Sequence, residues 1–153
     1  MANFTDPYRA NEFVVEIGTE ESPTVSKVSG LSLGETDTID IIEGGTNIVH
    51  KVSSGVVKYQ SLTLERRVDG SPDDALFKTF FEEMFKIGLG GQGSNARRDG
   101  AIVKKHLGQE VMRWAFYGGW IKSTSFSDLE AGGSSLLMQT IVLEHDGLEW
   151  IPA

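Results

Sequence analysis

RWAFYGGWIK (residues 113–122) and LLMQTIVLEHDGL (residues 136–148) are the two stretches that decide the fold of this chain. Aromatic and β-branched residues dominate both, which is typical of β-strands. The second stretch has few polar breaks, and a strand of that kind is usually covered on both faces. Because a small chain has little else to cover both faces of a sheet, we expect part of the cover to come from another copy of the chain. The sequence therefore predicts a β protein that assembles.

The length of 153 residues suits one domain, and we expect a single domain over residues 1–153. Cysteine is absent, which excludes disulfides and thiolate metal sites. The first residues lack the basic start and apolar core of a signal peptide, and no apolar stretch approaches the roughly 20 residues of a membrane helix. The formal net charge of −8 argues against a nucleic-acid-binding surface. We therefore expect a protein made in the cytoplasm that does not insert into membranes.

Segments with alternating or β-branched residues predict the strands. They are residues 12–17, 25–33, 38–43, 48–52, 57–68, about 101–106, 110–117, 119–126 and 136–146. Polar residues and Pro7 predict an N-terminal arm over residues 1–11, and glycines predict a flexible loop over residues 88–100. The pattern predicts a mainly β fold, an antiparallel β-barrel or sandwich with one flanking α-helix.

The segment 71–88 is the one with helical periodicity. Ser71 is predicted as its N-cap, Pro72 as its first helical residue and Gly88 as its C-cap. One face of the helix is apolar, and its members are Leu76, Phe77, Phe80, Phe81, Met84 and Phe85. A face so rich in phenylalanine is predicted to pack on the core rather than to form a ligand pocket.

An extended hairpin is predicted over residues 36–57. Gly44-Gly45 lies between its two strands and supplies the positive φ angle that a tight hairpin turn needs. Both faces carry mixed polar groups, and an isolated hairpin of this kind is only marginally stable in water. Two alternatives follow: the hairpin packs onto its own domain, or it reaches a neighbouring molecule.

No catalytic or cofactor-binding pattern has the context that its chemistry requires. The segment GLGGQG (88–93) matches G-x-G-x-x-G, but it follows a helix, whereas a dinucleotide site needs a preceding strand and a following helix. His50, His106 and His145 lie in separate predicted strands without zinc-type spacing. His145 with Asp146 is instead expected to make a surface or inter-subunit hydrogen bond. We expect no metal site, no cofactor and no enzymatic activity.

Two basic doublets stand out in an acidic chain, Arg66-Arg67 and Arg97-Arg98. The simpler interpretation is solvated surface. The alternative is that these arginines meet the acidic face of another subunit, since complementary charge fixes the register between partners.

Short motifs along nearly the whole chain form an ordered set. They are Asp6-Pro7-Tyr8, Phe13–Ile17, Val28–Leu31, Glu43-Gly44-Gly45, Lys51, Leu62–Leu64 with Arg66, Arg98-Asp99-Gly100, Arg113-Trp114, Trp120 with Lys122, and Gln139–Leu148. This set resembles the inner-tube (tail tube) proteins of contractile phage tails and of phage-tail-like contractile injection systems.

The resemblance implies a structural, non-enzymatic protein that closes into hexameric rings, which stack into a tube. It also implies the partners: further copies of the chain, a contractile sheath, baseplate and spike proteins, and a cargo effector or DNA in the lumen. The hairpin would contact the adjacent ring through its tip, which comprises Ile42, Glu43, Gly44, Gly45, Asn47 and Ile48. Such a protein is made in the bacterial cytoplasm and becomes part of an assembled phage tail-like particle.

The residues themselves leave a second class of protein open, a monomeric small β-barrel module that binds a lipid, sugar or peptide. The interior of such a module holds ligand instead of packed side chains. Size in solution distinguishes the two classes, because a tube protein forms rings or filaments and a binding module does not.

Overall fold

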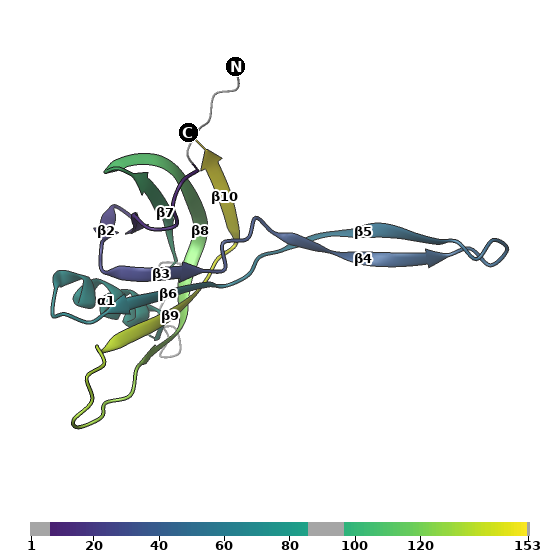
Figure 1. Cartoon of the computed structure of the whole chain (residues 1–153). Helices are drawn as coiled ribbons and strands as arrows, with labels where there is room; N and C mark the ends of the chain where they lie inside the picture. The colour runs from purple at the N-terminus through teal and green to yellow at the C-terminus, as the bar shows by residue number, and fades with distance from the viewer. Residues whose placement is uncertain (1–6, 86–96, 153) are drawn as a thin grey trace, which may run out of the picture.

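The computed structural model describes residues 7–85 and 97–152, and Figure 1 shows a β-rich body from which one long hairpin projects. The elements in chain order are β1 (Phe13–Ile17), β2 (Glu20–Ser22), β3 (Val25–Ser29), β4 (Glu35–Ile42), β5 (Val49–Lys58), β6 (Leu62–Arg67), α1 (Pro72–Phe85), β7 (Arg98–His106), β8 (Gln109–Phe126), β9 (Met138–Glu144) and β10 (Gly147–Pro152). Every paired strand is antiparallel. The predicted mainly β fold with a flanking helix is confirmed.

Strand β8 organises the body. On one side it pairs with β7, and on the other side its residues 112–117 pair with β10 while residues 120–126 pair with β9. The sheet continues outward through β1 and β2 beyond β7, and through β6 and β3 beyond β9. Figure 1 shows β8 curving between these two halves, which enclose the core.

The structure corrects the prediction of two strands at 110–117 and 119–126. β8 is one strand of 18 residues that runs through Gly118 and Gly119. Gly118 has a φ of 63°, and a Cβ at Gly119 would lie 2.7 Å from the ring of Phe116. The glycine pair therefore bends the strand and admits the Phe116 ring, which is a role that glycine often has inside strands.

The predicted strand at 136–146 is also shorter than expected. β9 covers Met138–Glu144, and its residues alternate between fully and partly buried positions. Leu136 is exposed, and the chain turns back at Asp146 to form β10, which the sequence patterns did not indicate. The expectation of a strand covered on both faces is therefore only partly correct.

Two further boundaries differ at the root of the hairpin. β3 ends at Ser29 instead of residue 33, and the strand predicted at 57–68 is divided between β5 and β6. A Cβ at Gly30 would lie 2.1 Å from the carbonyl oxygen of Ser61, so the two chain segments touch there. The contact between Gly30 and Ser61 marks the boundary at which the body ends and the hairpin begins.

Helix α1 covers the sheet through Phe77 and Phe80, which are fully buried. Burying one such side chain stabilises a fold by about 1.5–3 kcal/mol. The other members of the core are Val15, Ile17, Val25, Leu62, Leu64, Ile102, Phe116, Ile121, Ile141, Leu143 and Leu148. The side chains of Met84 and Phe85, the predicted C-cap Gly88 and residues 88–96 of the predicted loop lie outside the described residues.

Helix α1 begins at Pro72 as predicted, and the Ser71 carbonyl accepts from the Asp74 N–H (3.1 Å), but the Ser71 side chain does not cap the helix. The hydroxyl of Ser71 is buried without a hydrogen bond to any described group. Asp74 ties the preceding turn to the helix, because its carboxylate accepts a hydrogen bond from the Gly70 N–H (2.8 Å). Asp73 accepts hydrogen bonds from the hydroxyls of Ser22 (2.9 Å) and Thr24 (3.1 Å), which attaches the first turn to the sheet.

Candidate functional site: the assembly surfaces

The hairpin formed by β4 and β5 does not pack onto its own subunit. All residues of β4 are exposed, as are all of β5 except Ser54. The two strands pair only with each other, and Figure 1 shows them extending away from the body. Of the two alternatives for the hairpin, packing onto its own domain is therefore wrong.

The hairpin exposes a set of large apolar side chains among its polar ones. The large ones are Ile39, Ile41, Ile42, Ile48, Val49, Val52, Val56 and Val57. Register pairs Ile39 with Val52 and Ile41 with His50, so these four side chains share one face. Exposed apolar surface on this scale is typical of an interaction site rather than of free surface.

The turn of the hairpin lies between Ile42, the last residue of β4, and Val49, the first residue of β5. Its ends are joined by the Glu43 N–H, which donates to the Ile48 carbonyl (3.3 Å). The positive φ angle falls on Asn47 (53°) and not on Gly44 or Gly45, which corrects the expected role of the two glycines. The tip is polar, because the Glu43 carboxylate accepts from Thr46 Oγ1 (3.1 Å) and lies 3.4 Å from His50 Nε2.

The root of the hairpin is held by close packing and one ion pair. Gly34 has a φ of 110°, and a Cβ there would lie 2.6 Å from Val57 and 3.2 Å from the ring of Tyr59. Lys58 Nζ donates to Asp37 at 2.6 Å, and this hydrogen bond raises the pKa of Lys58 above its ordinary value. The hairpin therefore leaves the body at a defined place.

The two arginines of each basic doublet have different surroundings. Arg66 has an exposed fraction of 0%, so the expectation of a surface or inter-subunit contact is wrong for this residue. Its Nε donates to Thr24 Oγ1 (3.2 Å), and its Nη1 donates to Gln139 Oε1 (2.7 Å). Nη2 pairs with Asp74 at the start of α1, and the guanidinium lies over the ring of Phe77. Arg66 is the polar centre of the subunit's interior.

The other three predicted arginines lie nearer the surface. Arg67 is exposed, and its Nε is 3.5 Å from Asp69. Arg97 lies 3.0 Å from Asp146, and Arg98 donates to both oxygens of Glu83 while it packs over the ring of Phe80. Whether these three meet another subunit stays a prediction.

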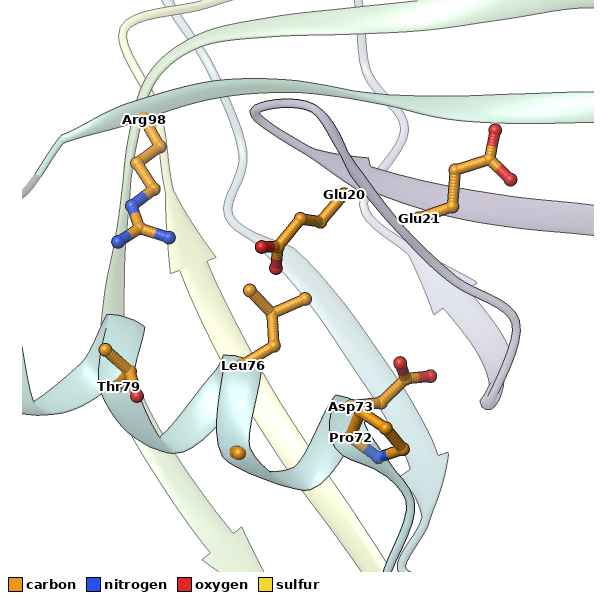
Figure 2. Close-up of a pocket in the computed structure, with 8 residues that line it drawn as sticks. Glu20, Glu21, Pro72, Asp73, Leu76, Thr79 and Arg98 are labelled. Carbon is orange, nitrogen blue, oxygen red and sulfur yellow. The ribbon is translucent and has the colours of Figure 1, made fainter.

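A groove of about 510 Å³ lies between β2 and α1. Figure 2 shows that Glu20 and Arg98 point into the space above the helix, while the carboxylate of Glu21 points away from it. Leu76 and Thr79 form part of the helix side of the groove. The carboxyl residues of the groove are Glu20, Glu21 and Asp73, and its one guanidinium is that of Arg98.

The histidines do not gather into a metal site. Across residues 7–85 and 97–152 no group of three or more potential ligands could hold a metal ion. His50 is at the hairpin, and the ring of His106 lies 5.4 Å from that of Tyr8. His145 is buried beside Tyr59, and neither of its ring nitrogens has a hydrogen bond to a described group, which corrects its expected role. Among the described residues no helix is long and apolar enough to cross a membrane.

A β-sheet body with a projecting hairpin that exposes large apolar side chains defines a structural subunit that works by assembly. The chain belongs to the family described as T4-like virus tail tube protein gp19, which matches residues 9–149. That family consists of structural tube proteins.

Solved structures share this fold. The anti-feeding prophage cap (AFP tube terminating cap) is 22% identical, with 100% of this chain and 96% of that chain covered and a TM-score of 0.81. A chain of the PVC sheath-tube complex of an extracellular contractile injection system is 23% identical, with 96% and 93% covered and a TM-score of 0.77. A chain from the tail of a GTA particle with C6 symmetry is 11% identical, with 96% and 100% covered and a TM-score of 0.63. No curated protein sequence matches the chain.

Proposed function

We propose that this chain is the repeating subunit of the inner tube of a contractile injection system or phage tail. Copies close into hexameric rings, the rings stack into a tube, and cargo or DNA passes through the lumen when the sheath contracts. The observation that carries the proposal is the β4–β5 hairpin, whose apolar side chains are exposed in a chain of the tail tube family.

The edges of the sheet supply the means of ring closure. β2, β3 and β10 each pair with one described strand and end the sheet on their outer sides. An open edge carries unpaired N–H and C=O groups that can pair with another chain. Pairing of one copy's edge with a different edge of the next is a heterologous contact, and such contacts form rings when the rotation closes. The C6 symmetry of the GTA tail supports a ring of six.

The partners follow from the same assembly. The similar PVC chain comes from a sheath-tube complex, and another similar chain comes from the AFP baseplate. We accordingly propose a contractile sheath around this tube, with baseplate and spike proteins at its end. The assembled phage tail-like particle is its place of action.

The filled interior argues against the alternative of a monomeric binding module. The centre of the sheet is occupied by packed apolar side chains and by the Arg66 network. The hollows at β2 and α1 and at the N-terminal residues are open surface features rather than a barrel interior.

Negative-stain electron microscopy over a range of concentrations tests the proposal. We expect rings or tubes with a central hole for the unaltered chain. Deletion of Glu43–Ile48, with Asn-Gly inserted to close the turn, should leave folded rings that no longer stack, because the tip of the hairpin is lost. Gly44→Ala is the matched control, since a Cβ there meets nothing within 4 Å.

Uniform small particles at every concentration, also with the baseplate proteins present, would contradict the tube function. Tubes of normal length from the deletion variant would instead contradict only the role of the hairpin tip.

A further inference from the structure

The two ends of β8 present different surfaces. A strand rises about 3.3 Å per residue, so the 18 residues of β8 run through most of the body. At its start is the β7–β8 turn with Leu107, and at its end is the loop formed by residues 127–137. Figure 1 shows this loop at the bottom of the view and the described N-terminal residues near the top, beside the end of β10.

The loop at 127–137 is apolar and acidic. Leu129 is 86% exposed, Leu136 is 75% exposed, and the adjoining Phe126 is also exposed. Asp128 and Glu130 are exposed without an ion pair to any described group, and the loop contains no basic residue.

Hydrogen bonds give this loop a defined shape. The Ser127 N–H donates to the Met138 carbonyl (2.9 Å), and the Met138 N–H donates to Ser127 Oγ (3.0 Å). A further turn is closed by the Gly133 N–H, which donates to the Glu130 carbonyl (3.1 Å). Leu129 and Leu136 therefore lie on a loop whose shape is held by hydrogen bonds.

The opposite end is hollow and basic. A hollow of about 480 Å³ is lined by Pro7, Tyr8, Arg9, Asn11, Glu12, His106 and Leu107. Leu107 is 81% exposed and has a φ of 52°, which turns the backbone at this end. Arg9 is exposed and, within the described part of the chain, has no carboxylate partner.

The one carboxylate in the hollow is already engaged. Glu12 Oε2 accepts from the Gly108 N–H (3.2 Å), and the Glu12 carbonyl accepts from the Lys105 N–H (2.9 Å). The same carbonyl accepts from the Nζ of buried Lys104 (3.3 Å). Around the hollow, Arg9, Lys104 and Lys105 stand against the carboxylates of Glu12 and of Glu110, the cross-strand partner of Lys105, so this end carries one more positive than negative charge.

We propose that the loop at 127–137 of one copy docks into the hollow at residues 7–12 and 106–107 of the next copy along the tube. This inference rests on the proposed stacking and names a second axial contact, separate from the hairpin. Leu129 and Leu136 cover Tyr8 and Leu107, while Asp128 and Glu130 face Arg9 and Lys105. A contact between two different ends of one molecule propagates into a filament.

Cysteine pairing in this cysteine-free chain tests the contact directly. We expect a Leu129→Cys, Leu107→Cys double variant, assembled into tubes and mildly oxidised, to give a ladder of covalent multimers that reducing agent collapses. Each single variant should give no ladder, because one cysteine can join at most two chains. Leu129→Cys with Lys78→Cys is the matched control, since Lys78 is exposed on α1 and belongs to neither of the two proposed surfaces.

Charge reversal provides a second test that does not depend on disulfide geometry. Asp128→Lys with Glu130→Lys should shorten the tubes at low salt, and adding Arg9→Glu with Lys105→Glu should restore their length. Normal tubes without a ladder, together with no effect of the charge reversal, would overturn the inference and leave the tube function in place. Failure of the unaltered chain to form rings or tubes would instead contradict the tube function itself.

Discussion

At the scale of single residues, Arg66 and Arg67 show how far two neighbours can differ. Successive side chains of a strand point to opposite faces, so Arg66 of β6 enters the interior and Arg67 faces solvent. The interior arginine connects the β2–β3 turn, β9 and α1 through Thr24, Gln139 and Asp74. Gln139 extends the connection, because its Nε2 donates to Thr124 Oγ1 of β8 (2.8 Å).

Arg66→Ala is expected to lower the free energy of unfolding by about 3 kcal/mol or more, because it leaves Asp74 and Gln139 without their buried partner. Arg67→Ala is the matched control, and its exposed pair with Asp69 is worth at most about 1 kcal/mol. Chemical denaturation at one subunit concentration measures both. Equal losses in the two variants would contradict the interior role of Arg66.

Tyr117 gives a residue-scale test in alkaline solution. Its hydroxyl donates to Glu149 Oε2 at 2.7 Å, and this carboxylate raises the pKa of the phenol. The resulting stabilisation is present below the unfolded pKa of about 10 and is lost as the pH rises through the folded pKa.

We expect one of the three tyrosines to ionise at a higher pH than in the unfolded chain, as followed by the ultraviolet absorbance of phenolate. Glu149→Gln should lower that pKa toward its ordinary value. An unchanged titration curve in this variant would contradict the assignment.

At the scale of elements, glycine allows neighbouring strands and side chains to approach each other closely, because it has no Cβ atom. A Cβ at Gly100 would lie 2.3 Å from the Glu16 carbonyl oxygen of β1 and 2.5 Å from the Phe116 ring of β8. The pairing of β1 with β7 therefore depends on the absence of a side chain at this position.

Gly100→Ala is expected to destabilise the subunit by about 1–3 kcal/mol, the usual cost of overpacking a well-filled core. Gly44→Ala at the hairpin tip has open space around the new methyl group and should leave stability unchanged. Thermal unfolding of the two variants side by side provides the measurement. A Gly100→Ala variant as stable as Gly44→Ala would show that β1 and β7 are further apart than described.

At the scale of the whole molecule, the subunit consists of a well-packed body and of projecting segments that are exposed to solvent. The body has a filled core, while the hairpin and the loop at 127–137 carry exposed apolar side chains. Substitutions on those surfaces should therefore affect assembly without affecting folding.

Ile41→Asp places a charge on the apolar face of the hairpin and should abolish tubes while the free energy of unfolding changes by no more than about 0.5 kcal/mol. Asp40→Ala, on the other face of the same strand, is the control and should still assemble. Sedimentation measures assembly, and circular dichroism measures folding. Tubes of normal length from Ile41→Asp would show that this face is not covered in the tube.

Much of the fold could be predicted from local sequence because local patterns report local structure. The helical period of Leu76, Phe77 and Phe80 identified α1, and the β-branched run around Ile39–Ile42 identified the hairpin strands. The ordered motifs identified the tail tube family that residues 9–149 match. These features depend on neighbours a few residues apart, which one sequence shows directly.

Only the tertiary structure decided what depends on residues far apart in the chain. The burial of Arg66 depends on Thr24 and Gln139, and the passage of β8 through Gly118-Gly119 depends on the Phe116 ring. The loop at 127–137 and the hollow at residues 7–12 and 106–107 lie at different ends of the body because the long strand β8 runs between them. Sequence by itself determined which elements form and what class of assembly they serve, because periodicity and turn chemistry are local. The fold decided which charges are buried and which are exposed, because burial is set by long-range packing.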